Sequence, residues 1–295
     1  MDFPVSGVET YWWLPILVSF GISCFSSIGG VSGAFLLLPF QISVLGFTGP
    51  AVSPTNLVFS IVAIPSGVYR YWRERRMVWP LAWMTIVGTL PGVFIGAVIR
   101  VRYLPDPTSF KPFAAIVLLY IGGRLAFDFL SGSRAAVPVK SGAFSVQPRL
   151  FNLKRIEYEF EGSLYSASSG GILALSFVVG IVGGTYGIGG GAIIAPFFVS
   201  VFGLPVYTVA GATLLGTFVT SIAGVGFYVF LDTFYAQAGT AVMPDWLLGG
   251  MFGIGGVFGM YVGARLQRFV SARVIKATLA TLLLFVAVRY LAPLF

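Results

Sequence analysis

Long apolar runs separated by short polar segments follow one another along the whole of this chain. Most of them approach the roughly 20 residues that an α-helix needs to cross the hydrocarbon core of a membrane. The pattern therefore predicts an all-α polytopic membrane protein that lies in the lipid bilayer. The runs cover residues 12–28, 33–46, 51–69, 78–99, 110–130, 168–184, 189–203, 206–231, 244–265 and 274–292.

Two stretches, 12–46 and 168–203, are too long for a single span. Each has about 35 residues, and an α-helix rises about 1.5 Å per residue. Each is broken by glycines, at 29–33 in the first stretch and at 183–191 in the second. We predict that each forms two helices joined at the glycines, as a hairpin that either spans the membrane or re-enters it. With three further spans after each hairpin, the chain has 8 long hydrophobic segments and about 10 helices.

The two hairpins are copies of one sequence. Residues 29–46 read GGVSGAFLLLPFQISVLG and residues 186–203 read YGIGGGAIIAPFFVSVFG, which places Gly33 on Gly190 without a gap. Later in the chain, the glycines at 88, 92 and 96 correspond to those at 255, 259 and 263. A duplicated, glycine-broken, apolar chain is typical of secondary transporters.

The charges on the loops predict how the two copies are oriented. The loop 70–76 holds four arginines, so it is expected in the cytoplasm, whereas its counterpart 232–243 has no Lys or Arg. Equivalent loops on opposite sides make the repeats inverted, with an odd number of crossings in each. Only the loop 100–111, with three basic residues on the outer side, disagrees with the charge rule.

This orientation divides the chain into a first transmembrane repeat, 1–130, a cytoplasmic linker, 131–167, and a second transmembrane repeat, 168–295. Both termini are then external, in a multi-pass protein of the cell membrane. The first ten residues lack a basic region, so a cleaved signal peptide is not expected.

Composition removes several classes of function. Charged residues are 9% of the chain and hydrophobic residues 57%. The net charge of +8 fits basic residues that flank membrane spans better than it fits nucleic-acid binding. With one cysteine and no histidine, metal sites built on those residues and His-based catalytic triads are excluded. We expect no catalytic residue, no metal, no cofactor and no enzyme activity.

The glycine breaks are the first candidate binding site. Non-helical backbone at membrane depth is tolerated where it is buried in protein or lines a cavity. A short helix follows each break, and its N-terminal N–H groups and dipole attract anions. The two breaks are expected to converge on one small anionic substrate, although their glycines could instead serve only close helix packing. The candidates are Ser26, Ser27, Gly29, Gly30, Ser32 and Gly33 in the first half, and Thr185, Tyr186, Gly187, Gly189, Gly190 and Gly191 in the second.

The start of the next helix in each half is a second candidate. The sequence Ser53-Pro54-Thr55-Asn56 suits a first helical turn, and Asn56 occupies the same repeat position as Thr213. We expect Thr55, Asn56, Thr213 and Thr217 to complete the pocket, unless they only cap helices or bond between them.

Two equivalent arginines, Arg124 and Arg289, lie within apolar runs and are candidates for attracting an anion. Each also has a plainer interpretation, since Arg124 has Asp128 one turn away and Arg289 is close enough to the chain end to reach the interface. The glycine ladders 88/92/96 and 255/259/263 are interpreted as helix-packing seams.

At the glycine breaks the chain resembles the sulfite exporter TauE/SafE family of permeases, also called TSUP. The resemblance depends on Gly187-Ile188-Gly189-Gly190-Gly191 leading to Pro196, on a weaker copy leading to Pro39, and on Thr55-Asn56-Leu57 with Ala212-Thr213-Leu214. It implies export of a small sulfur-containing anion, such as sulfite, an organosulfonate like sulfoacetate, sulfate or thiosulfate.

Several alternatives remain open beside this resemblance. An anion channel would share the same site, a permease could carry a non-sulfur carboxylate, and a membrane scaffold would transport nothing. A homodimer is compatible with the sequence and not required by it. Asp128, Asp232 and Asp245 are the only acidic residues near the spans and fall near helix ends, so no carboxylate proton relay is expected.

Overall fold

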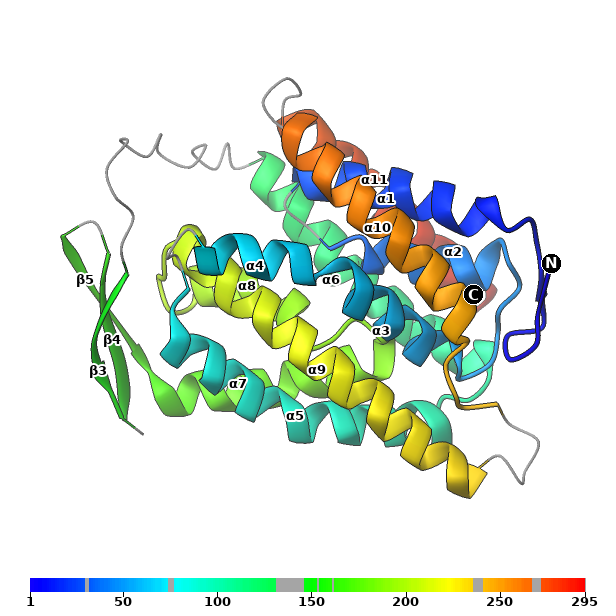
Figure 1. Cartoon of the computed structure of the whole chain (residues 1–295), viewed down its shortest axis with the longest axis horizontal. Helices are drawn as coiled ribbons and strands as arrows, with labels where there is room; N and C mark the ends of the chain where they lie inside the picture. Colours follow the sequence, from blue (N-terminus) through cyan, green and yellow to red (C-terminus); the bar gives the residue numbers. More distant parts are fainter. Residues whose placement is uncertain are drawn as a thin grey trace.

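The computed structural model describes residues 1–29, 32–73, 77–130, 146–152, 154–160, 162–235, 241–266 and 272–294. The chain is mostly helical (Figure 1). Within these residues, 6 helices are long and apolar enough to cross a membrane, and the helices Trp13–Ser27, Ala34–Ser43 and Ala277–Leu291 are apolar but shorter. The predicted polytopic membrane protein is confirmed in this general form.

Each predicted apolar run became a helix or a pair of helices. In the first half these are α1 Trp13–Gly29, α2 Ala34–Ser43, α3 Val52–Ala63, α4 Pro65–Arg73, α5 Trp79–Arg102 and α6 Pro107–Leu130. In the second half they are α7 Ser169–Tyr186, α8 Gly191–Ser200, α9 Val206–Tyr235, α10 Trp246–Leu266 and α11 Ala272–Leu291, with a 3₁₀ turn, Ala292–Leu294, after it.

The two glycine breaks do separate helices, as the sequence predicts. Helix α7 ends at Tyr186, and the next residue, Gly187, has a left-handed φ of 86° that suits glycine. Helix α8 begins at Gly191 and runs for 10 residues. In the first half, α1 ends at Gly29 and α2 begins at Ala34. Gly30, one of the predicted site residues, lies outside the described residues.

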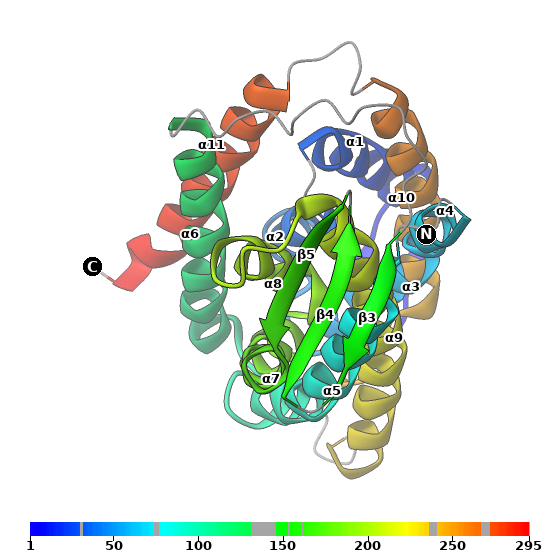
Figure 2. The ribbon, with the colours of Figure 1, turned by 90° about the vertical axis from the view of Figure 1, so that its left-hand side faces the viewer.

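The longest helix contacts join the two halves of the chain. Helix α5 packs on α7, α1 packs on α10, and α6 packs on α11. In Figure 2 these pairs occupy different flanks of the bundle, and α2 and α8 lie between them. A Cβ at Gly92 would collide with Phe177 O of α7, and one at Gly259 with Phe20 O of α1. The prediction that the glycine ladders are packing seams is therefore confirmed.

The all-α prediction needs one correction, in the segment predicted as a linker. Strands β3 Gln147–Phe151, β4 Arg155–Phe160 and β5 Ser163–Ser168 form an antiparallel sheet in that order. In β4, buried Ile156, Tyr158 and Phe160 alternate with the more exposed Glu157 and Glu159, which is the period of a strand with one covered face.

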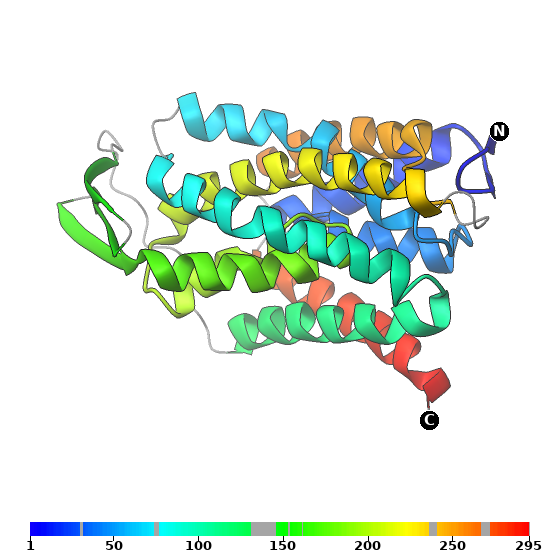
Figure 3. The same cartoon turned by 90° about the horizontal axis from the view of Figure 1, so that it is seen from below.

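The sheet is attached to the helical bundle through Tyr158. Its hydroxyl lies 2.7 Å from Thr208 Oγ1, near the start of α9. Burial raises the pKa of the Tyr158 phenol to about 12, and the hydrogen bond to Thr208 opposes this shift. The sheet lies at one end of the molecule, and both chain termini lie at the other (Figures 1 and 3).

A short hairpin at the N-terminus closes the end with the termini. Strands β1 Asp2–Phe3 and β2 Val8–Glu9 pair, and Phe3 and Val8 are buried. Between them, the Ser6 hydroxyl and N–H donate to Asp245 Oδ2 at 2.8 and 3.2 Å. Asp245 is only 2% exposed and also accepts from the Leu248 N–H, so it caps α10.

Candidate functional site

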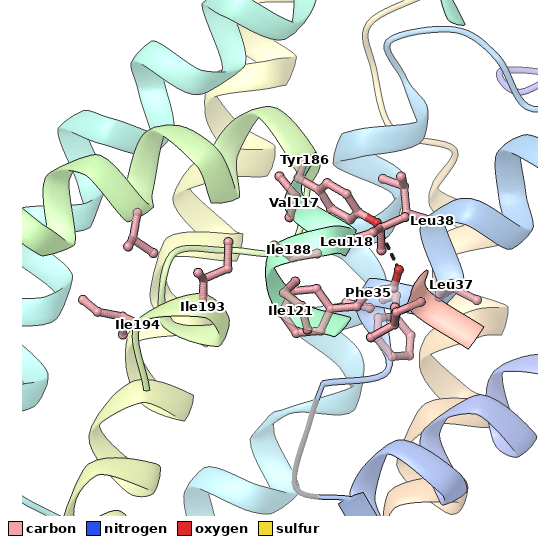
Figure 4. Close-up of a cluster of buried hydrophobic side chains, with 14 of the residues drawn as sticks. Phe35, Leu37, Leu38, Val117, Leu118, Ile121, Tyr186, Ile188, Ile193 and Ile194 are labelled. Atoms are coloured by element: carbon pink, nitrogen blue, oxygen red, sulfur yellow. Dashed lines mark hydrogen bonds between the residues drawn. The ribbon is translucent and has the colours of Figure 1, made fainter. Parts of the chain in front are cut away.

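The two glycine breaks meet at Asn56 of α3. Its Nδ2 donates to Ala34 O at 3.1 Å and to Gly187 O at 2.9 Å. Ala34 opens α2, and Gly187 follows the last residue of α7. The Tyr186 hydroxyl adds a second link, to Phe35 O at 3.0 Å (Figure 4). Asn56 and Tyr186 thus connect the two glycine breaks by hydrogen bonds.

Apolar side chains surround this meeting point. Figure 4 shows Leu118 and Ile121 of α6 close to Tyr186 and Ile188, all of them buried. In such surroundings hydrogen bonds are strengthened, and a polar group without a partner is costly. Each polar atom near the breaks is therefore expected to have a partner.

The glycines of the second break allow close contact with α3, α5 and α9. A Cβ on Gly187 would collide with Ser53 O, and one on Gly190 would lie 2.5 Å from Thr89 Cγ2. A Cβ on Gly191 would collide with the Thr213 carbonyl oxygen. The packing interpretation of these three glycines therefore holds, whether or not the break also binds a ligand.

Most of the predicted polar residues already donate a hydrogen bond from their hydroxyl to another group of the protein. A hydroxyl has a single proton to donate, and each of these groups donates it to a backbone carbonyl oxygen. They are Ser26 to Ile22 O at 2.7 Å, Ser27 to Met260 O at 3.3 Å, Thr55 to Ala51 O at 2.7 Å, Thr185 to Ile181 O at 2.8 Å, Thr213 to Val209 O at 3.1 Å and Thr217 to Thr213 O at 2.8 Å.

The remaining predicted residues are positioned as follows. Ser32 Oγ accepts from the Ala34 N–H at 3.3 Å, which leaves its proton for another acceptor. Gly33 precedes α2, and Gly29 is the last residue of α1. Gly189 has a left-handed φ of 71° and lies against α9.

Two serines that the sequence did not single out lie directly at the breaks. Ser23 Oγ of α1 and Ser221 Oγ of α9 are buried, and neither has a hydrogen-bond partner among the described residues. Each lies 3.0 Å from the position of a Cβ on a break glycine, Gly33 for Ser23 and Gly189 for Ser221. Both break segments therefore contact a polar atom without a partner, inside an apolar environment.

The arginine that lies beside the second break is neither of the two that were predicted to attract an anion. It is Arg100, which the sequence pattern places in a loop. It is 0% exposed, and its Nε donates to Ser53 Oγ at 3.2 Å. Ser53 Oγ in turn donates to Thr185 O at 3.1 Å. Arg124 is half-buried on α6, 5.9 Å from the centre of the Phe127 ring, and Arg289 is exposed on α11.

Membrane-length helices that enclose two broken hairpins define a multi-pass membrane protein of the transporter class. The family model described as sulfite exporter TauE/SafE matches residues 15–290. The chain belongs to this family of membrane transporters. No curated protein and no solved structure matches it. Within the described ranges, no group of three or more His, Cys, Asp or Glu residues is arranged to hold a metal ion.

Proposed function

We propose that this protein exports a small sulfur-containing anion, sulfite or an organosulfonate such as sulfoacetate, and that the anion binds where the two breaks meet. The observation that carries the proposal is the pair of buried hydroxyls, Ser23 and Ser221, each without a partner beside a break glycine. Leaving such a group without a hydrogen bond costs about 1–3 kcal/mol, and an anion that accepts a hydrogen bond from it would remove this cost.

The geometry of the short helices supports an anion in particular. Helices α2 and α8 begin at the breaks, so the positive ends of their dipoles and their first N–H groups lie beside these hydroxyls. Ser32 adds a third hydroxyl whose proton is not used by its bond to Ala34. Donors without a matching acceptor suit an oxyanion better than a cation or a neutral amine.

Alternating access requires two halves that can move against each other. The pairing of α5 with α7 corresponds, under the sequence repeat, to the pairing of α10 with α1. This exchange, and the position of both termini opposite the sheet, support two inverted repeats related by an axis in the membrane plane. Rocking of one helix group against the other would then expose the breaks to each side in turn.

The membrane potential supplies the driving force in this proposal, with the termini outside and the sheet in the cytoplasm. An anion leaving a negative interior gains about 2.3 kcal/mol per charge per 100 mV. Among the described residues, Asp245 is a buried carboxylate, and its oxygens already accept from Ser6 and Leu248. It caps a helix here, so the proposal assigns it no role in proton transfer.

Efflux from proteoliposomes tests the proposal directly. Vesicles are loaded with sulfite, sulfoacetate, taurine, sulfate or thiosulfate, and efflux is followed with and without an inside-negative potential. Selective, voltage-accelerated efflux of a sulfur oxyanion is expected. Flux that does not saturate would instead indicate a channel, efflux of carboxylates alone would change the substrate class, and no flux of any anion would contradict the proposal.

Gly190→Val is the variant designed to stop transport, and it is compared with a matched glycine-to-valine control. The added side chain would occupy the space of the Thr89 side chain, which already lies 2.5 Å from a Cβ at this position. Gly250→Val on α10 is the control, since nothing lies within 4 Å of a Cβ there. The first variant is expected to stop transport and the second to retain it.

A further inference from the structure

Arg100 carries a buried positive charge that is stabilised by neutral groups alone among the described residues. Its guanidinium donates to Ser53 Oγ, to Gly49 O at 3.1 Å, and to the carbonyl oxygens of Leu104 and Pro105. All four acceptors are neutral. The face of the guanidinium lies 3.9 Å from the centre of the Phe110 ring, which adds a cation–π contact.

No carboxylate in the described part of the chain forms an ion pair with this group. The Asp106 carboxylate interacts electrostatically with the guanidinium without an ion pair, and because Asp106 is exposed, solvent largely screens this interaction. Charges buried in proteins are ordinarily paired, because desolvating an unpaired one is expensive. Each guanidinium nitrogen therefore has a hydrogen-bond partner, and no described residue supplies a counter-ion.

The charge is connected directly to the second break. Ser53 accepts from Arg100 and donates to Thr185 O, two residues before Gly187. The backbone of Ser53 also forms the surface against which Gly187 is packed. An anion at the breaks would thus lie within a few hydrogen bonds of the buried cation.

The charge also distinguishes the two halves. The register that aligns Gly96 with Gly263 places Arg100 on Gln267, which is uncharged. Arg100 lies at the end of α5 next to the start of α6, which is the end of the molecule that carries both termini (Figure 3). At the aligned position itself, the sequence of the second half therefore carries no charge that corresponds to Arg100.

We infer that Arg100 is the specificity-determining residue of the site, the fixed charge that makes it select anions over neutral or zwitterionic sulfur compounds. The inference rests on the proposed function, since it assigns the counter-ion role to the transported anion. Ser53 positions the guanidinium beside the break, and Phe110 holds it flat. A net charge of +1 at the empty site favours a sulfite or a sulfonate anion and disfavours taurine.

Anion-dependent thermal stabilisation of the purified protein tests this inference. A ligand that binds the folded state raises the unfolding midpoint with its concentration, so the half-saturating concentration of sulfite or sulfoacetate can be measured for each variant. Arg100→Gln removes the charge and Arg100→Lys retains it. Arg102→Gln is the control, because it makes the same change of charge at an exposed position two residues away.

The neutral variant is expected to need at least about tenfold more anion, since a unit charge within about 10 Å changes affinity by roughly that factor in a protein interior. Arg100→Lys is expected to bind with an intermediate affinity, and Arg102→Gln like the unchanged protein. If Arg100 only caps the end of α5, the lysine variant will bind as poorly as the glutamine variant, which overturns the inference.

A second pair of variants keeps the arginine in place, in case Arg100→Gln does not fold. Ser53→Asp puts a carboxylate beside the guanidinium and cancels its charge, while Ser53→Asn has nearly the same shape and no charge. The inference predicts loss of anion binding in the first and not in the second, and equal binding by both contradicts it. If the unchanged protein binds none of the anions, the proposed function itself fails.

Discussion

Removing a hydroxyl that has no partner separates the energetics of folding from those of binding. Ser221 and Ser176 are both buried, and neither Oγ has a hydrogen-bond partner among the described residues. Ser221 lies beside Gly189 of the second break, whereas Ser176 of α7 lies in the seam against Gly88 of α5. Alanine at either position removes the same atom from a fully buried position.

The expected magnitudes follow from this difference in position. Deleting an unpaired buried hydroxyl recovers part of its desolvation penalty of about 1–3 kcal/mol, so both variants should be more stable without ligand, by about 2 °C or more. A hydrogen bond to a charged group contributes about 1.5–3 kcal/mol. Ser221→Ala alone should therefore weaken anion binding, by roughly ten- to a hundredfold.

Thermal unfolding with a titration of sulfite measures both effects in one experiment. The purified unchanged protein, Ser221→Ala and Ser176→Ala are compared at each concentration. The reasoning is refuted if Ser221→Ala binds sulfite as tightly as the unchanged protein, or if Ser176→Ala loses affinity to the same extent. A loss of stability in both variants without ligand would show that these hydroxyls are paired in the folded protein.

Three further predictions concern packing, backbone conformation and pH. Gly259→Ala should destabilise the protein by about 1–3 kcal/mol because its Cβ meets the backbone of α1, whereas Gly250→Ala on the same helix should not, as thermal unfolding would show. Gly187→Ala should destabilise the protein more than Gly46→Ala, because both residues have positive φ but only at Gly187 would the added Cβ also collide with a neighbouring atom. Equal losses of stability in the two variants would contradict this. The pKa of Tyr158 is about 12 in the folded chain and lower in the unfolded chain, so its contribution to the stability of the fold is complete below about pH 10 and is lost as pH rises through about 12. Tyr158→Phe should therefore lose less stability at alkaline pH than the unchanged protein, as unfolding measured at a series of pH values would show.

The helices could be predicted because apolar runs in a chain with 9% charged residues have few other outcomes. The three-stranded sheet could not be predicted from composition, since the charge in its segment is equally typical of a linker. The alternation in Arg155–Phe160 is present in the sequence, with Ile, Tyr and Phe at every second position. In this segment the periodicity, rather than the composition, indicates the structure.

The meeting of the two glycine breaks could be predicted from the sequence, but the unpaired hydroxyls beside them could not. Glycine breaks and the Asn56 position could be found from the repeat, and the fold brings them together through Gly187 and Ala34. Ser23 and Ser221 lie inside helices, and no local signal separates them from serines that bond to their own helix. Only the return of α2 against α1, and of α8 against α9, places these hydroxyls beside a break.

The exchange of helix partners between the halves has a consequence for how the protein is made. Helix α1 is synthesised before α10, the helix it packs against, and helices α2 to α9 are made between them. Until α10 is made, the carbonyl-lined face of α1 that receives Gly255 and Gly259 is exposed to lipid or to a chaperone. Helices α1 to α6 on their own are thus an incomplete folding unit, and insertion of α7 to α11 completes their tertiary packing.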